Sequence, residues 1–237
     1  MQNFKRYEEK YLISQEQCAE LRKVISQRME PDCFGEYMVQ NLYYDTENWD
    51  VIRASTEKPF YKEKMRLRCY DIPDTESQVF LELKKKYRGI VYKRRGAIPF
   101  RELSYRSIRD VASAESSQVL REFNFYLKNN EVLEKIYIVY MRAAIGTDCG
   151  ELRVTFDSDI RFRLESLDYL NPEDGTLILP RDKIVMEIKS PGGMPLWMSR
   201  LLCENKIFPT AFSKYGECYT GYIMKRPEFK RREQLSV

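Results

Sequence analysis

The sequence contains no histidine among its 237 residues. This absence excludes histidine general bases, histidine metal ligands, Ser–His catalytic pairs and phosphohistidine intermediates. Any chemistry must therefore use carboxylates, Lys, Arg, Tyr, Ser, or a metal ion that is held by oxygen ligands. The sequence also lacks a GxxxxGK[ST] run, so it does not predict a P-loop phosphate site.

Long apolar runs are missing as well. No stretch of about 18 apolar residues occurs, and residues 1–9 are polar and charged, without the apolar segment of a signal peptide. The six cysteines are scattered and form no CxxC pair, which favours reduced thiols over a disulfide framework or a zinc site. We therefore expect a cytoplasmic protein with no transmembrane segment.

The charges are nearly balanced. A net charge of +4 results from 40 basic and 36 acidic residues, so the arrangement of the charges is more informative than their sum. No fixed-period repeat or low-complexity linker divides the chain. We predict one domain over residues 1–224 and a basic, flexible tail over residues 225–237. We interpret this tail as a solvated end, and we expect no nucleic-acid partner.

Strand patterns are interrupted by helical patterns near the start, the middle and the end of the chain. Ser14 and Gln17 form a capping-box pattern before the first helix. Helices are expected over 14–30, 103–128, 195–205 and 213–224. Strands are expected over 4–13, 37–44, 64–70, 79–87, 90–100, 136–144, 151–162 and 183–190. Short connections between consecutive strands favour an antiparallel sheet, and eight strands can close into a barrel.

Charged residues occupy one face of nearly every predicted strand, because side chains at i and i+2 point to the same side. In the strand 64–70, for example, Arg66 and Arg68 alternate with apolar residues. Cations outnumber anions on these faces. The cations are Arg6, Lys10, Arg66, Arg68, Lys84, Lys93, Arg95, Arg142, Arg153, Arg161 and Lys189, and the anions are Glu8, Glu82, Asp157, Asp159 and Glu187.

A half-exposed sheet with its charged face in water is one explanation of this pattern. A solvated face, however, tolerates Ser, Thr, Gln and Asn freely, whereas these faces favour closely spaced Arg, Lys and Glu. We therefore predict an α+β fold, an eight-stranded antiparallel β-barrel with a charged interior and helices packed on the outside. Unpaired buried charges are costly, so the excess of cations predicts an anionic ligand such as phosphate. The few carboxylates suit a divalent metal ion.

These charged motifs resemble a known family. Arg6-Tyr-Glu8-Glu-Lys10-Tyr11 resembles the N-terminal strand motif of the VTC polyphosphate polymerase domain, a variant of the ExExK motif of the triphosphate tunnel metalloenzymes, the CYTH superfamily. The resemblance covers residues 3–224. Further matches follow in chain order: Asn41-Leu-Tyr-Tyr-Asp45, Arg66-Leu-Arg68, Glu82-Leu-Lys84, Lys93-Arg94, Tyr140-Met-Arg142, Arg153 to Asp157, Glu187-Ile-Lys189 and Ser213-Lys214-Tyr215.

The resemblance implies a tunnel that binds triphosphate or polyphosphate together with Mn²⁺ or Mg²⁺. Arg6 stands where the wider superfamily has Glu, which favours the polymerase-like branch over a two-metal hydrolase. Carried over to this chain, the resemblance implies catalytic roles for Lys10, Arg66, Arg68, Lys84, Lys93 and Arg142, substrate binding by Tyr140, Arg153, Lys189, Ser213 and Lys214, and metal binding by Glu187 and Glu8.

The activity implied is metal-dependent transfer of the ATP γ-phosphoryl group to a growing polyphosphate chain, with release of ADP. Two alternatives stay open. One is a tripolyphosphatase or nucleoside triphosphatase in the same tunnel, and the other is a non-enzymatic polyphosphate-binding module. ATP and polyphosphate or triphosphate are the expected partners, and the sequence leaves the oligomeric state open.

Overall fold

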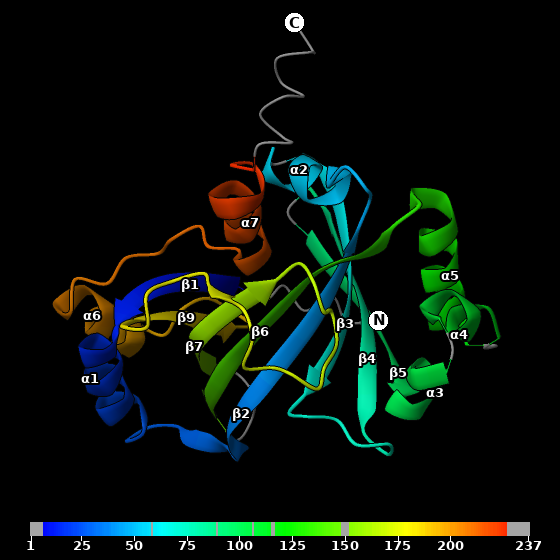
Figure 1. Ribbon diagram of the computed structural model, residues 1–237. Helices are drawn as coiled ribbons and strands as arrows, with labels where there is room; N and C mark the ends of the chain where they lie inside the picture. The colour runs from blue at the N-terminus through cyan, green and yellow to red at the C-terminus, as the bar shows by residue number, and fades with distance from the viewer. Residues whose placement is uncertain are drawn as a thin grey trace, which may run out of the picture. The chain divides into compact units, whose positions relative to one another are not determined.

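The computed structural model describes residues 7–57, 59–88, 90–105, 107–114, 117–147 and 152–226. The fold is mixed α+β, with one nine-stranded antiparallel sheet (Figure 1). The strand order is β1-β9-β7-β6-β2-β3-β4-β5, and β8 pairs with β7. No helix in these ranges is both long enough and apolar enough to cross a membrane.

The nine strands include one for each of the eight predicted. They are β1 (Tyr7–Ser14), β2 (Glu30–Asp45), β3 (Tyr61–Tyr70), β4 (Gln78–Tyr87), β5 (Ile90–Pro99), β6 (Leu133–Gly146), β7 (Arg153–Arg163), β8 (Thr176–Leu177) and β9 (Lys183–Ser190). The short β8 is an addition. The predicted starts at residues 4 and 151 lie outside the described residues, as does most of the basic tail, residues 227–237.

The helices are α1 (Gln15–Ile25), α2 (Asp50–Thr56), α3 (Phe100–Tyr105), α4 (Ile108–Ala114), α5 (Gln118–Asn130), α6 (Leu196–Glu204) and α7 (Lys214–Cys218), with the π-helix η1 (Tyr219–Ile223) directly after α7. The capping box at Ser14 is confirmed. The first helix ends at Ile25 rather than near Glu30, because Ser26 caps it and β2 already begins at Glu30.

The expected closure into a barrel is not seen. It requires a pairing between β1 and β5, the first and last strands of the hydrogen-bonded path, and the residues described here make no such pairing. The antiparallel sheet and its alternation of apolar and charged faces are as expected, whereas the closed eight-stranded barrel is not.

The chain divides into two compact units. Unit 1 comprises Met1–Met38, Tyr140–Arg161 and Leu177–Lys214. It contains β1, β7 and β9, whose apolar faces carry side chains such as Tyr11, Phe156 and Met186. Helices α1 and α6 lie beside these strands in Figure 1. They supply Leu21 and Met198 to the same core. The apolar face of these strands is therefore covered by helices, which leaves the charged face for other contacts.

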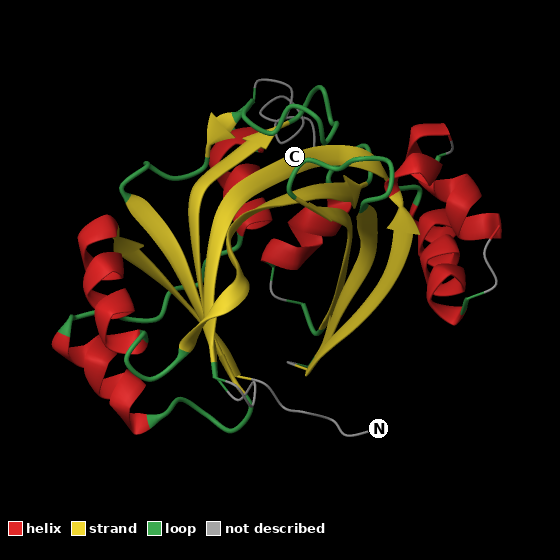
Figure 2. Cartoon of the chain, turned by 90° about the horizontal axis from the view of Figure 1, so that it is seen from below, coloured by secondary structure: helices red, strands yellow, loops and turns green. Residues whose placement is uncertain are grey.

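Unit 2 comprises Val39–Val139, Phe162–Thr176 and Tyr215–Val237. Strands β3, β4 and β5 bury an apolar face that includes Met65, Leu67 and Leu81. Helix α5 packs closely on β5, since a Cβ atom added at Gly96 would meet Leu120 Cδ2 at 3.5 Å. Figure 2 shows helices, in red, beside the yellow strands. On the charged strand face of unit 2, Tyr215 of α7 lies against Tyr43, with ring centres 4.9 Å apart, and against Lys64, whose Nζ is 5.6 Å from the centre of the Tyr215 ring.

Candidate functional site

The charged face of unit 2 is organised in rows that run across the strands. In one row, Arg66 of β3 lies opposite Tyr43 of β2 and Glu82 of β4, and Glu82 lies opposite Arg95 of β5. Because side chains two residues apart share a face, the next row on the same face brings together lysines of three strands, Lys64, Lys84 and Lys93.

Glu82 is the centre of a cation cluster. Its side chain is 2% exposed. Arg66 donates through Nε and Nη2 to Oε2 at 2.8 and 2.6 Å. Lys93 Nζ lies 2.6 Å from Oε1, Arg95 Nε donates to Oε1 at 2.8 Å, and Arg68 Nε lies 3.9 Å from Oε2. One carboxylate thus neutralises one of four cations, and the cluster keeps an excess of positive charge.

The ionisation of Glu82 depends on these neighbours. Burial alone would raise the pKa of Glu82, but Arg66, Arg68 and Lys93 outweigh burial and hold the pKa well below its ordinary value. Burial also lowers the pKa of Lys93 in spite of the nearby carboxylate. Glu82 is therefore a permanent anion at neutral pH.

The two arginines of β3 are held by further polar side chains. Arg66 Nη1 donates to the Tyr43 hydroxyl at 2.9 Å, and Arg68 Nε donates to Asn41 Oδ1 at 2.9 Å. Asn41 is itself fixed, because its Nδ2 donates to the Ile138 carbonyl at 3.1 Å. These guanidinium groups are preorganised before any ligand is present.

The lysine row brings three like charges onto one face of the sheet. Like charges directly opposite each other destabilise a sheet. Lys93 contacts Glu82, Lys64 Nζ lies 5.6 Å from the centre of the Tyr215 ring, and Lys84 is exposed. A polyanion on this row would relieve the repulsion among the three lysines.

Unit 1 carries a second charged site, on β1 and β9. Lys10 lies opposite Glu187, and Glu8 lies opposite Lys189. Lys189 Nζ is 2.7 Å from Glu187 Oε1, and Lys10 donates to the Phe212 carbonyl at 3.1 Å. Burial would raise the pKa of Glu187, but Lys189 and Lys10 outweigh it and lower that pKa. Glu187 is therefore ionised as well.

Asp157 of β7 is the centre of a further charged cluster in unit 1. Arg142 donates to both of its carboxylate oxygens, at 2.6 and 2.8 Å, and Lys214 Nζ donates to Oδ2 at 2.5 Å. The same two cations lie 5.2 and 4.3 Å from the centre of the Tyr140 ring. Burial raises the pKa of Asp157, but Lys214 and Arg142 lower it further than burial raises it.

The predicted site residues thus fall into defined groups. Unit 2 brings Arg66, Arg68 and Lys93 together around one carboxylate, with Lys84 in the adjacent row. Unit 1 groups Lys10, Lys189, Glu8 and Glu187, and separately Tyr140, Arg142 and Lys214.

Two further predicted site residues, Arg153 and Ser213, lie outside these groups. Arg153 lies opposite Lys189, but its Nη2 donates to Asp32 Oδ2 at 2.8 Å. Ser213 is exposed directly before α7. Arg6, whose identity supported the polymerase-like branch, lies outside the described residues.

Sequence reasoning placed Glu82, Arg95 and Asp157 on the charged face but did not assign them to the site. Each proves to be a cluster member, and Glu82 and Asp157 are the buried carboxylates that organise the cations. The alternation pattern contains their positions. What it lacks is the cross-strand register, which decides which cations each carboxylate meets.

The fit of a metal ion can be judged from the carboxylates. Across the described ranges, no group of three or more Asp, Glu or Cys side chains could hold one. Mg²⁺, however, is commonly bound by one or two carboxylates together with substrate phosphates. Glu187 and Glu8 lie on neighbouring strands, two residues apart in the register and therefore on the same face, and Glu187 is ionised. This pair fits a metal ion that shares its coordination with a phosphate ligand.

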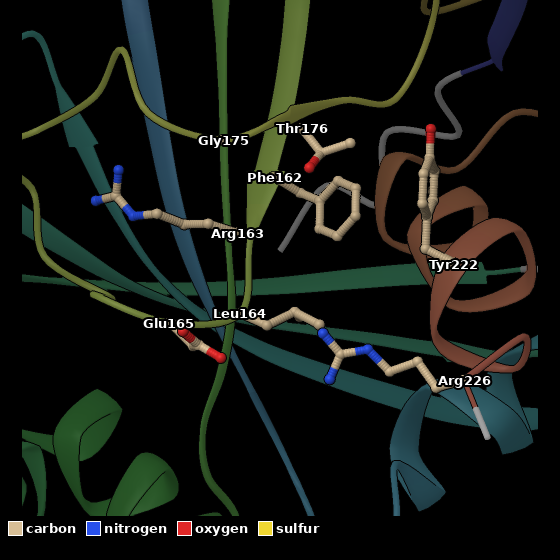
Figure 3. A pocket seen from close by; sticks show the side chains of 8 residues that line it. All are labelled: Phe162, Arg163, Leu164, Glu165, Gly175, Thr176, Tyr222 and Arg226. Atoms are coloured by element: carbon tan, nitrogen blue, oxygen red, sulfur yellow. The ribbon is translucent and has the colours of Figure 1, made fainter. Parts of the chain in front are cut away.

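A pocket of about 370 Å³ also lies in unit 2 (Figure 3). Arg163 extends away from Phe162 and Tyr222, donates to the carbonyls of Ser166, Asp168 and Asn171, and therefore fixes a loop. None of the predicted site residues lines this pocket, whose lining is Phe162, Arg163, Leu164, Glu165, Gly175, Thr176, Tyr222 and Arg226.

Comparison with solved structures shows similar folds at low sequence identity. HpAC1 from Hippeastrum, a candidate adenylyl cyclase with a dominant triphosphatase activity, is 18% identical over 90% of this chain and 95% of its own, with a TM-score of 0.51. The PH1819 protein from Pyrococcus horikoshii OT3 is 15% identical over 91% and 99%, with a TM-score of 0.47. A candidate adenylate cyclase from Vibrio parahaemolyticus is 13% identical over 91% and 98%, with a TM-score of 0.47.

Comparison with protein families is more specific. No curated protein matches the chain at a significant level. The VTC domain family, in contrast, matches residues 5–222, which confirms the resemblance carried by the charged motifs. Since this match spans nearly the whole sequence, the chain belongs to the VTC domain family.

Proposed function

We propose that the chain is a metal-dependent polyphosphate polymerase that transfers the γ-phosphoryl group of ATP to a growing polyphosphate chain and releases ADP. The observation that carries this proposal is the cluster around Glu82, where four cations share one buried carboxylate. Arginine suits directional contacts to phosphate oxygens, and lysine suits point-charge contacts. The remaining positive charge matches a ligand that carries several phosphates.

The proposed reaction needs no protein nucleophile. A terminal oxygen of the acceptor phosphate attacks the γ-phosphorus in line, and the bond from this phosphorus to the β–γ bridging oxygen breaks, so that ADP leaves. Catalysis then consists of positioning and charge stabilisation. Arg66 and Arg68 suit this role, because their contacts with Glu82, Tyr43 and Asn41 fix them in advance.

In unit 1, we assign phosphate binding to Lys10, Arg142 and Lys214, with Arg153 and Lys189 as further cations and with Tyr140 and Ser213 as hydroxyl donors. Lys84 has the same phosphate-binding role in unit 2. Glu187, together with Glu8, would hold Mn²⁺ or Mg²⁺. When it is bound, such an ion neutralises part of the phosphate charge.

The test is to incubate the protein with ATP and Mn²⁺ and to separate the phosphate products by size. Long phosphate chains and ADP are the expected products. The Glu187→Ala variant should lose turnover, whereas Glu122→Ala, which removes a surface partner of Arg94, should not. If the wild type binds polyphosphate but never turns over ATP, the chain is a binding module and the enzyme proposal is wrong.

A triphosphatase is the second candidate. Two observations favour it: the exposed carboxylate of Glu8 lies beside Lys10, where it could orient water, and the similarly folded Hippeastrum protein has a dominant triphosphatase activity. In that reaction water replaces the acceptor phosphate, so free phosphate would be released from ATP or tripolyphosphate without chain growth. The ratio of chain-bound to free phosphate discriminates the two activities.

A further inference from the structure

One end of β3, β4 and β5 carries large apolar side chains that are exposed. Antiparallel pairing brings Tyr61 opposite Tyr87, and Tyr87 opposite Ile90. We use the name tip patch for six residues that are 46–81% exposed: Phe60, Tyr61, Tyr87, Ile90, Val91 and Tyr92. Single exposed apolar residues need no explanation, but several of them gathered at one strand end, with Tyr61, Tyr87 and Ile90 in one cross-strand row, indicate an interaction surface.

The tip patch is fixed by its own contacts. The Arg88 amide donates to the Phe60 carbonyl at 2.8 Å, which ties the entry of β3 to the end of β4. The rings of Tyr61 and Tyr87 meet edge to face with their centres 6.5 Å apart. The Arg88 guanidinium lies 5.4 Å from the centre of the Tyr87 ring. The exposed side chains are therefore presented by an ordered strand end.

Basic residues lie directly behind the outermost row of the tip patch, which consists of Tyr61, Tyr87 and Ile90. In the next cross-strand row Lys86 lies between Lys62 and Val91, and Lys62 Nζ donates to the Ser55 carbonyl at 3.1 Å. In the row after that Lys85 lies opposite Tyr92, and its Nζ is 3.1 Å from Glu63. A strand rises about 3.3 Å per residue, so these lysines lie roughly 3–7 Å behind the apolar row. The segment 84–95 contains seven cations and no carboxylate.

We propose that the tip patch docks this protein on an anionic membrane surface. Aromatic and aliphatic side chains would enter the boundary between headgroups and acyl chains, where interfacial segments are buried about 5–10 Å deep. At the same time Lys86 and Arg88 would reach the lipid phosphates, because long basic side chains keep their charge at the interface. The spacing between the apolar row and the lysines matches this depth.

Two other occupants fit the surface less well. Single-stranded nucleic acid needs ring faces for base stacking, but Ile90 and Val91 have no ring, and Tyr61 and Tyr87 pack on each other. The cores of protein–protein interfaces are depleted in lysine, whereas lysines adjoin this apolar row on two strands. The combination of apolar tip and basic flank is typical of attachment to anionic lipid.

The test is cosedimentation with vesicles of phosphatidylcholine, with and without phosphatidylserine. We expect roughly tenfold stronger binding to the anionic vesicles, and weaker binding at high salt, because the attraction is partly electrostatic. The double variant Phe60→Ser/Ile90→Ser should bind these vesicles roughly tenfold more weakly, because the inserted apolar area is lost. Phe125→Ser is the matched control: Phe125 is 71% exposed on α5, and its loss should change nothing.

A second readout reports insertion directly. An Ile90→Trp variant should show a blue-shifted tryptophan emission with anionic vesicles only, and brominated lipid should quench that emission. The proposal is overturned if the wild type binds neither kind of vesicle, if the double variant binds as well as the wild type, or if the emission does not shift. Binding of single-stranded oligonucleotides without binding of vesicles would overturn it as well. Neither Phe60 nor Ile90 belongs to the charged clusters, so these outcomes do not depend on ATP turnover.

Discussion

At the scale of single residues, the decisive group is the carboxylate of Glu82. Within the described part of the chain it is the anion that Arg66, Lys93 and Arg95 share, and its side chain is buried. Removing one partner from a buried charge cluster costs more than the whole cluster contributes, because the remaining charges stay desolvated. Glu82 therefore has a structural role that a ligand could partly take over.

The Glu82→Gln variant should unfold more easily at neutral pH. We expect the free energy of unfolding to fall by about 3 kcal/mol in urea titrations, since a buried charge partner is lost. Glu63→Gln, which removes the more exposed pair with Lys85, should cost about 0.5 kcal/mol. Added tripolyphosphate should restore part of the stability of the Glu82 variant. Equal losses in the two variants would contradict the central position of Glu82.

The pH dependence of stability follows from the lowered pKa values of Glu82, Glu187 and Asp157. A carboxyl whose pKa is lower in the folded than in the unfolded state stabilises the fold above its unfolded pKa, about 4.3 for Glu, and this stabilisation is lost as the pH falls toward the folded pKa. Wild-type stability should therefore decline below about pH 4, with a shallower slope in Glu82→Gln. Urea unfolding at several pH values measures both slopes, and parallel slopes would show that Glu82 is not involved.

Substitution of Arg68 tests whether the site binds phosphate through directional hydrogen bonds. Its guanidinium is buried and held by Asn41, and lysine cannot reproduce its fork of donors. Arg68→Lys should lower kcat for phosphoryl transfer by roughly 100-fold, the scale for losing one preorganised donor. Arg94→Lys is the matched control on β5, where Arg94 pairs with Glu122 at the surface. Comparable losses in both variants would remove Arg68 from the proposed site.

At the scale of elements, the register of β3, β4 and β5 creates the row of Lys64, Lys84 and Lys93. The repulsion within this row results from the pairing of three strands rather than from any one residue. The same arrangement that disfavours the empty sheet favours a bound polyanion. Stability and affinity should therefore respond in opposite directions to the loss of one lysine.

The Lys84→Gln variant tests this opposition. Its free energy of unfolding should rise by about 0.5 kcal/mol, because a like-charge contact across the strands is removed. Its affinity for tripolyphosphate should fall, as measured by calorimetry, and the affinity should become less sensitive to salt. Lys128→Gln on α5 should change neither quantity. A loss of both stability and affinity in Lys84→Gln would show that the lysine row is not under strain.

At the scale of the whole molecule, turnover and ligand binding should depend on different groups: turnover on the divalent metal, and binding on the protein cations. Chelation of divalent metal should abolish turnover. Without the ion that Glu187 and Glu8 would hold, part of the phosphate charge is no longer neutralised. Binding of tripolyphosphate should largely persist, since the Glu82 cluster consists of protein cations. A thermal shift assay with and without chelator measures the binding. Complete loss of the ligand-induced shift in chelator would contradict a metal-independent cation cluster.

The alternation of apolar and charged residues was enough to predict the strands and the charged face, because each strand has one buried face. It could not predict β8, which has two residues, or α2, whose first amides are capped by Asp45 from the end of β2. It also could not assign partners to Glu82 and Asp157. Those depend on pairing between distant strands, and that register leaves no local pattern in the sequence.

The lysine row has a consequence for how a long ligand could move. Arginine contacts are directional and fix one phosphate in one place, whereas ammonium groups are nearly non-directional. Similar groups repeated across neighbouring strands offer a linear polyanion several positions of nearly equal energy, much as basic proteins slide along a phosphate backbone. A phosphate chain on Lys64, Lys84 and Lys93 could therefore advance by one unit without dissociating, and processivity would be a property of the strand register.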